Sequence, residues 1–309
     1  PCRYHVPVAD FTPPTPEQLA AHLQRHPPRP PSRWTARAPL IVMIAALVVA
    51  ILLGNIWAMV LPWAALLGVF LYLVVRVRGA RGLEQRTTRV QELSMLRRYP
   101  EGLRRAWTLV PRLTHQPTLY IRCVALLSQC LHQLKAYDAA IVGYDGLLEH
   151  LPHEYPGAIQ LRAHRALAAL HGDRLADADD TLRQLRNVVG PYAHTTIGAT
   201  VRLAELTQAT RTHHYTDPLD RADRLLEELR PLGVEAGYGH ALLALCHRED
   251  RSERDETGRR AQVQLWWNRA TTLLPEAALL DRYPELTALR HTANPPTPDR
   301  SDARSEGPD

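Results

Sequence analysis

Histidine and cysteine give this chain its clearest potential for metal chemistry, because the sequence contains 15 His and 4 Cys. His150, His153 and Glu154 lie close together, but Pro152 stands between the two histidines. The helical i, i+4 spacing that brings two imidazoles onto one metal ion is therefore absent. A second His/Cys cluster, at 240–247, falls on one expected helix, where the neighbours Cys246 and His247 point about 100° apart. We expect no metal site at either place.

Nucleophilic chemistry would need a thiol or hydroxyl beside a base. Cys123 and Cys130 precede His132 on one expected helix. Cys130 and His132 would point about 200° apart on that helix, which does not suit a catalytic pair. The sequence also has no glycine-rich phosphate loop and no serine elbow. We therefore expect no catalytic residue, no cofactor and no enzymatic activity, with an enzyme of unrecognised site as the remote alternative.

Residues 40–75 form an apolar run without a charged side chain. A membrane-spanning helix needs roughly 20 apolar residues, so this run favours two spans over one helix of about 54 Å. The turn-prone pair Gly54-Asn55 predicts spans over about 38–53 and 56–75. A re-entrant hairpin or a single span with an unusual flank are the alternatives. No charged residue interrupts the run, which favours an anchor over an ion pathway.

Arginines flank the apolar run on both sides, and their position predicts its orientation. Both termini are expected in the cytoplasm, so that the chain would be integral to the cytoplasmic (inner) membrane. Arg76, Arg78 and Arg81 directly follow the run and are expected to face anionic lipid headgroups. Lys135 is the single lysine in the chain, a bias typical of a GC-rich genome, and we expect a bacterial source.

The formal charge of +5 is unevenly distributed. Residues 76–114 carry ten Arg and three Glu, a net of +7, whereas residues 115–309 carry 22 basic and 27 acidic residues, a net of −5. No basic stripe with interleaved aromatic residues runs through the chain, so nucleic acid is not expected as a partner.

Apolar residues recur at spacings of three and four from Leu83 onward, which predicts paired helices. Turn residues place the second helix of each pair about 36 to 44 residues after the previous one, a spacing typical of a repeat architecture. Those second helices are expected to begin near Pro100, Tyr137, Asp173, Asp217 and Gly258.

One stretch, 121–154, carries the repeat pattern most fully. In its first helix a leucine is followed by a small residue, Leu127-Ser128. Its second helix begins at Tyr137, has the small residue Ala140 for close helix contact, and continues with the aromatic Tyr144 and the apolar Leu148. Pro152 ends the unit. This stretch resembles a tetratricopeptide repeat (TPR), a helix–turn–helix unit of 34 residues. Val124 and Leu147 depart from the family, which usually has tryptophan and alanine there. Less complete units extend the resemblance over about 85–290.

The resemblance implies an all-α fold, a TPR-like α-solenoid of helix–turn–helix repeats preceded by the transmembrane helical hairpin. The inner surface of such an array commonly binds protein segments, and the matching positions here are Arg122, Gln129 and His132. Arg162 and Arg165 are candidates from the next unit. The set lacks the Lys/Asn arrangement of the carboxylate-clamp subfamily, and the alternative is that these are solvated polar positions.

The sequence thus predicts four segments. They are a Pro/His-rich arm (1–37), mostly disordered except for a short helix at Pro16–Arg25 capped by Thr15, the membrane hairpin (38–77), the repeat domain (78–290) and a disordered tail (291–309). We expect a membrane-anchored adaptor that recruits protein partners at the cytoplasmic membrane face. The alternative is a structural subunit of a larger integral membrane complex.

Overall fold

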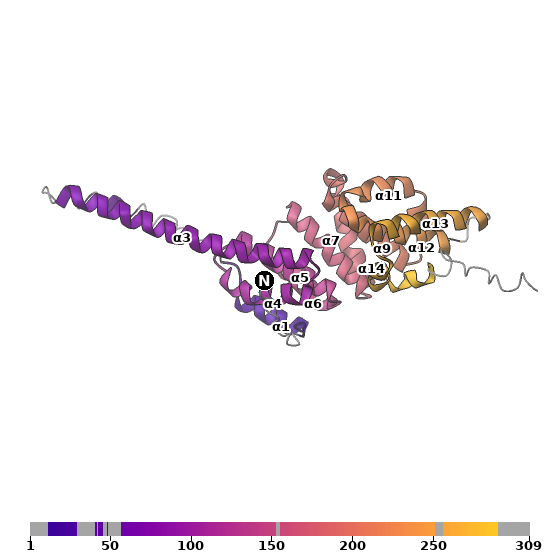
Figure 1. Ribbon diagram of the computed structural model, residues 1–309, viewed down its shortest axis with the longest axis horizontal. Coiled ribbons are helices and arrows are strands. Elements are labelled where there is room, and N and C mark those ends of the chain that lie inside the picture. Colours follow the sequence, from indigo (N-terminus) through magenta and orange to yellow (C-terminus); the bar gives the residue numbers. More distant parts are fainter. Residues whose placement is uncertain are drawn as a thin grey trace, which may run out of the picture. The chain divides into compact units, whose positions relative to one another are not determined.

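The computed structural model describes residues 12–29, 57–152, 155–250 and 256–289, together with 41, 43–45 and 48. Every regular element among these residues is a helix, which confirms the all-α prediction for the described part (Figure 1). The chain divides into two compact units, unit 1 (Pro1–Leu151) and unit 2 (Pro152–Asp309).

Unit 1 holds five α-helices and one 3-10 turn among its described residues. They are α1 (Pro16–Arg25), α3 (Trp57–Met95), α4 (Tyr99–Leu109), η1 (Val110–Arg112), α5 (Pro117–Gln133) and α6 (Tyr137–Leu148). Helix α4 packs against both α3 and α5, and α5 packs against α6. The core of this unit includes the fully buried side chains Leu103, Leu127 and Tyr144.

Helix α1 has the predicted bounds, and its start is explained by a capping box. The Thr15 hydroxyl accepts from the Gln18 backbone N–H at 3.3 Å, and the Gln18 side chain accepts from the Thr15 N–H at 3.0 Å. Helix α1 packs on α6, where Leu19 is fully buried. At Gly146 of α6 an added Cβ would lie 3.2 Å from the Leu23 side chain, so a small residue there allows the close approach of α1.

An aromatic contact joins α1 to α4. The His22 imidazole stacks on Trp107 with ring centroids 4.0 Å apart. Burial, followed by the charges of His26 and Arg25, lowers the pKa of His22 below its ordinary 6.5. The docked helix therefore holds His22 in the neutral form.

Acidification is expected to weaken the docking of α1. The folded-state pKa of His22 lies below the unfolded value, so its contribution is present above pH 6.5 and is lost as the pH falls through the folded pKa. Hydrogen exchange, corrected for its intrinsic pH dependence, should show protection of residues 16–25 dropping several-fold between about pH 7 and about pH 5. His22→Phe keeps an aromatic stack without a titrating group and should abolish this drop. An unchanged pH profile in that variant would show that another group controls α1.

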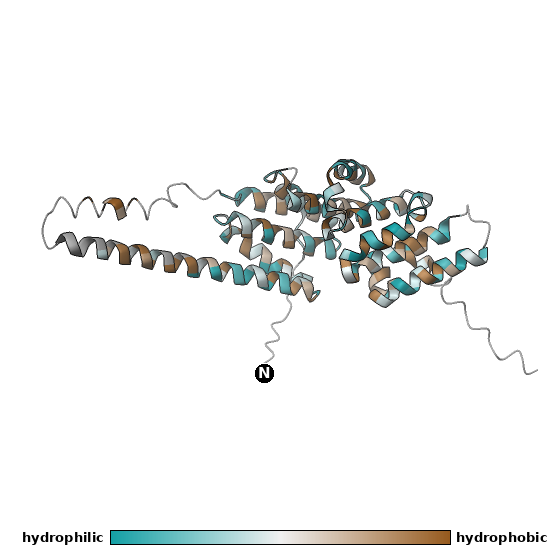
Figure 2. Cartoon of the chain, turned by 90° about the horizontal axis from the view of Figure 1, so that it is seen from above, coloured by the Kyte–Doolittle hydropathy of each residue, from teal (hydrophilic) through white to brown (hydrophobic). Residues whose placement is uncertain are grey.

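Helix α3 does not end where the apolar run ends. It continues past Val75 through Arg78 and Arg81 to Met95 as one helix of 39 residues. Its first half exposes large apolar side chains, for example Trp63 (72%) and Phe70 (61%). Its second half is more polar, as the colours of Figure 2 show. Helix α3 packs on α4 and α5.

The predicted membrane hairpin is corrected by this arrangement. Among the described residues, no helix combines the length and the apolar character that crossing a bilayer requires. The predictions of two transmembrane spans and of an integral protein of the cytoplasmic membrane, with both termini and the repeat domain cytoplasmic, are therefore wrong. The physical reason is that the end of an uncharged run does not determine where a helix ends. Helix α3 contains most of the predicted second span (56–75) and continues from it into a charged segment. Most of the predicted first span (38–53) and the Gly54-Asn55 turn lie outside the described residues.

Unit 2 holds eight α-helices and three 3-10 turns among its described residues. They are α7 (Pro156–His171), α8 (Leu175–Val188), η2 (Gly190–Tyr192), α9 (Thr196–Arg211), α10 (Thr216–Leu219), α11 (Ala222–Leu229), η3 (Arg230–Glu235), α12 (Ala236–Glu249), α13 (Glu256–Leu273), α14 (Glu276–Arg282) and η4 (Pro284–Leu286). Helix α7 packs against α8 and α9, and its fully buried residues include Ala163 and Ala166. The Tyr283 hydroxyl, beyond α14, lies 3.2 Å from the Thr207 hydroxyl of α9 and ties these segments together.

The same type of helix C-terminus occurs four times in the described part of the chain. Arg97, Lys135, Asp173 and His213 each follow a helix with φ near +60°, in the left-handed conformation that usually favours glycine. Each donates its N–H to the carbonyl three residues back, and the next residue donates to the carbonyl five residues back. This is the Schellman pattern, which satisfies the last carbonyls of the helix.

The four Schellman residues stand 38, 38 and 40 residues apart, and each precedes a second helix. Those helices begin at Tyr99, Tyr137, Leu175 and Thr216. All four starts lie within two residues of the starts predicted from the turn signals. The fifth predicted start, Gly258, lies within the first turn of α13.

Candidate functional site

The predicted partner-binding residues of unit 1 lie on α5 in different environments. Arg122 is exposed and donates through its Nη2 to the Gln91 side chain of α3. Gln129 is half-buried, whereas His132 is only 2% exposed and its ring meets Tyr137 edge-on at 5.7 Å. The structure therefore brings these three residues onto one helix but not onto one open surface.

The predicted residues of unit 2 lie on α7. Arg162 is 7% exposed, and burial lowers the pKa of its guanidinium. Arg165 donates to the Thr181 hydroxyl of α8 at 2.9 Å. The Arg165 side chain thus lies where α7 packs on α8, and a role in partner binding stays a prediction for both arginines.

The basic residues expected to face lipid all lie on α3. Arg78 and Arg81 are exposed, and Arg76 lies on the same helix. Their contact with anionic headgroups stays a prediction.

The thiols considered as nucleophiles are buried. Burial raises the pKa of Cys123 to about 12 and that of Cys130 to about 11, and the Cys123 thiol donates to the Ala106 carbonyl at 3.7 Å. A thiol with so high a pKa supplies almost no thiolate near neutral pH. Within the described ranges, no group of three or more His, Cys, Asp or Glu side chains could hold a metal ion.

Unit 2 contains an open groove of about 930 Å³. Helices α8, α9, α10 and α11 line it, and we call it the α8–α11 groove. Its apolar lining includes Leu206 of α9 and Leu225 of α11, which are both buried. Its charged lining comes from α8, α9, α10 and the residues that lead from α10 into α11.

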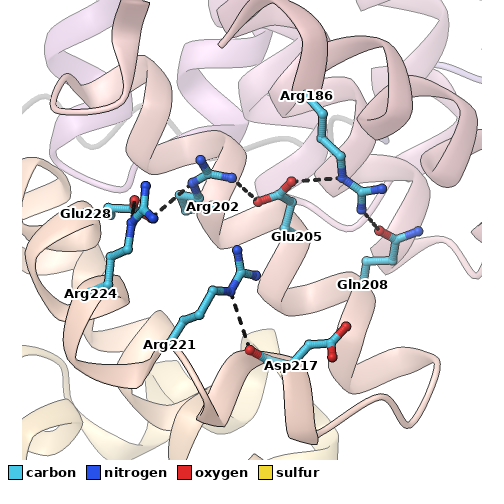
Figure 3. Close-up of polar contacts among 8 residues, drawn as sticks. All are labelled: Arg186, Arg202, Glu205, Gln208, Asp217, Arg221, Arg224 and Glu228. Carbon is cyan, nitrogen blue, oxygen red and sulfur yellow. Dashed lines mark hydrogen bonds and ion pairs between the residues drawn. The ribbon is translucent and has the colours of Figure 1, made fainter. Parts of the chain in front are cut away.

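An alternating chain of charges runs from the groove lining, which holds Arg186, Glu205 and Arg202, to two residues of α11 outside it (Figure 3). Arg186 of α8 donates to Glu205 of α9 at 3.0 Å, and Glu205 also binds Arg202 at 2.6 Å. Arg202 then binds Glu228 of α11 at 3.0 Å, and Glu228 accepts from Arg224 at 2.7 Å. Five side chains from three helices are thus joined into one network, which we call the Arg–Glu ladder.

The middle of the ladder is its most buried part. The side chains of Arg202, Glu205 and Glu228 are 16%, 12% and 5% exposed. Burial would lower the pKa of Arg202, but hydrogen bonds and charge from Glu205 and Glu228 raise it above its ordinary value. Arg202 is therefore a permanent cation that joins α9 to α11.

Gln208 extends the network toward α8. Its amide accepts from Arg186 at 3.3 Å and donates to Asp179 at 2.9 Å. This bond from Gln208, together with the bond and charge from Arg183, lowers the pKa of Asp179. The groove wall is consequently fixed by contacts on both sides of α9.

The opposite rim of the groove is exposed, and its charged side chains form fewer bonds within the protein. Arg221 donates through Nε to the Asp217 backbone carbonyl at 3.4 Å, as Figure 3 shows. The carboxylates of Asp217 and Asp220 have no side-chain partner within the described part of the chain, and both residues are exposed. The groove thus combines a fixed wall with a rim whose charges can bind an incoming segment, while its lining holds no thiol.

Sequence patterns could have found only part of this groove. Arg202 and Glu205 stand three residues apart, and Arg224 and Glu228 stand four apart, which are the spacings at which charges on one helix face each other. The bonds that join separate helices, such as Arg202 to Glu228, have no such local signal.

No match was found by comparison with known proteins. Neither a protein-family model, a curated protein nor a solved structure matches the chain. The resemblance of 121–154 to a TPR therefore rests on the residues of that stretch alone.

Proposed function

We propose that this chain is a non-enzymatic adaptor, a TPR-like α-solenoid whose helical hairpins bind a segment of a partner protein in the α8–α11 groove. The groove itself carries the proposal. It is large enough for several side chains, is partly apolar, and has a charged wall that is already fixed before any partner arrives. Fixed groups lose little conformational freedom on binding, which favours affinity.

The recurrence of one helix ending supports the repeat interpretation. Four Schellman residues, each between the first and the second helix of a hairpin, stand 38, 38 and 40 residues apart, so successive hairpins have nearly constant length. This period is about four residues longer than the 34 of a TPR. In the stretch that resembles the family most closely, the first helix is α5, which has 17 residues and therefore more than four turns. We therefore propose a TPR-like unit with lengthened helices.

The free charges of the rim indicate what kind of segment fits. The ladder cations are engaged by Glu205 and Glu228, whereas Asp217 and Asp220 face solvent. A partner segment that places a lysine or arginine against α10 and an apolar side chain against Leu225 would complement both features.

Charge reversal at the rim tests this function. Full-length protein with Asp217→Lys and Asp220→Lys should lose at least about 90% of the partners that the wild type captures, since like charges at a rim suppress association. The matched control is Asp223→Lys with Glu227→Lys on α11, which reverses two exposed charges outside the groove lining. Captured proteins are compared by quantitative mass spectrometry, with circular dichroism to verify folding. Equal recovery by the rim variant and the wild type would contradict the proposal.

A further inference from the structure

A second groove lies in unit 1, between α3 and α4, and we call it the arginine groove. It encloses about 430 Å³ and is lined by α3, α4 and η1. Val90 of α3 and Leu109 of α4, which are 0% and 5% exposed, form its apolar base. Gly102 of α4 lies against both α5 and α3, since an added Cβ would lie 3.2 Å from the Cys130 Sγ and 3.8 Å from Leu93.

Four exposed guanidinium groups surround this base. Arg86 and Arg89 come from α3, Arg105 comes from α4, and Arg112 comes from η1. None of the lining residues is acidic. Arginine stays charged at all relevant pH values, so the groove concentrates about four positive charges in a small volume.

Most of this charge is not neutralised by the protein. Arg89 pairs with Glu92 at 2.6 Å on the surface of α3. The side chains of Arg86, Arg105 and Arg112 have no ion pair or hydrogen bond within the described part of the chain. Neighbouring like charges destabilise a protein unless a counter-charge binds, so a groove of this kind favours an anionic ligand.

The chemistry of the lining narrows the ligand class. Guanidinium forks match phosphate oxygens in bidentate geometry, and Gln85 adds an amide donor. No aromatic residue lines the groove to stack on nucleic-acid bases. The volume is in the lower range of small-molecule sites and suits a compact anion better than an extended chain.

We propose that the arginine groove binds a compact anion carrying two or more phosphate groups. The site lies in unit 1 and is independent of the partner groove of unit 2, so either proposal can fail without the other. Binding requires no covalent step.

Isothermal titration calorimetry with inorganic tripolyphosphate tests the site. The full chain is kept in a non-ionic detergent because α3 exposes apolar side chains. The wild type should show saturable one-to-one binding at low salt. Arg105→Gln should weaken it about tenfold, since one charge-assisted contact is lost, and Arg86→Gln should do so independently from the other helix.

The control is Arg230→Gln, which removes an arginine whose side chain is 82% exposed in unit 2 and should leave the affinity unchanged. Circular dichroism verifies that each variant is folded. Absence of saturable binding by the wild type, or an equal loss in the Arg230 control, would overturn the proposal. Tighter binding of a single-stranded oligonucleotide with the same sensitivity to Arg105→Gln would overturn the assignment to a compact ligand.

Discussion

Replacement of Arg202 by methionine is expected to destabilise the contact between α9 and α11 by about 3 kcal/mol. The substitution keeps much of the side-chain volume but leaves the Glu228 side chain, which is 5% exposed, with only the exposed Arg224 as its partner. Removing one member of a buried ion pair costs this much because the remaining charge is poorly solvated. Hydrogen exchange followed by mass spectrometry on the full chain should show the free energy of local opening falling in α9 and α11.

Two further variants distinguish the cost of leaving a buried carboxylate without its partner from the cost of losing any ion pair. Arg183→Met removes an arginine that is 66% exposed and should cost at most about 1 kcal/mol, although it also ends contacts with Asp179 and Asp180. Glu228→Leu introduced together with Arg202→Met should restore much of the stability, because it also removes the buried Glu228 carboxylate, whose one remaining partner would be the exposed Arg224. An effect of Arg202→Met no larger than that of Arg183→Met would show that the ladder does not stabilise this contact.

Gly198→Ala is expected to cost unit 2 about 3 kcal/mol. Gly198 lies in the first turn of α9, directly beneath the turn that begins with η2. An added Cβ would lie 2.3 Å from the Tyr192 carbonyl oxygen and 2.8 Å from that of Ala193. These are backbone atoms and cannot rotate away, so the turn itself would have to move and would strain the bond from the Gly198 N–H to the Thr195 hydroxyl.

Gly190→Ala is the matched control for this prediction. It lies in the same connection between α8 and α9, but an added Cβ there would meet nothing within 4 Å. Neither glycine has a positive φ, so the two substitutions differ in contacts and not in backbone strain. Gly190→Ala should be neutral or stabilise by up to about 1 kcal/mol, since alanine reduces the freedom of the unfolded chain. Thermal unfolding followed by circular dichroism compares the two, and similar midpoints would contradict the predicted clash.

Features set by neighbouring residues could be predicted from the sequence. The bounds of α1 followed from Thr15 and the first-turn residue Gln18, because a capping box involves only residues three apart. The starts of the second helices likewise followed from local turn residues. The extent of α3 could not be predicted in this way, because the end of the apolar run at Val75 does not coincide with the end of the helix at Met95.

The functional surfaces depend on residues that are distant in sequence. His132 has the position that the family resemblance assigns to an open inner surface, yet the ring of Tyr137 covers it from the next helix. The α8–α11 groove was not predicted, since Arg186 and Glu205 are 19 residues apart and meet only after α8 and α9 have packed. The arginine groove has the same origin, because α3 and α4 contribute to it separately.

The Schellman turns at Arg97, Lys135, Asp173 and His213 have a consequence for how the chain reaches its structure. Each turn closes a pair of helices within about 40 residues, so many native contacts join residues that are near in sequence. Low contact order is associated with fast folding, because little loop entropy is lost before contacts form. A growing chain could therefore complete one hairpin while the next is still being synthesised, and each finished hairpin would offer a surface on which the following one can fold.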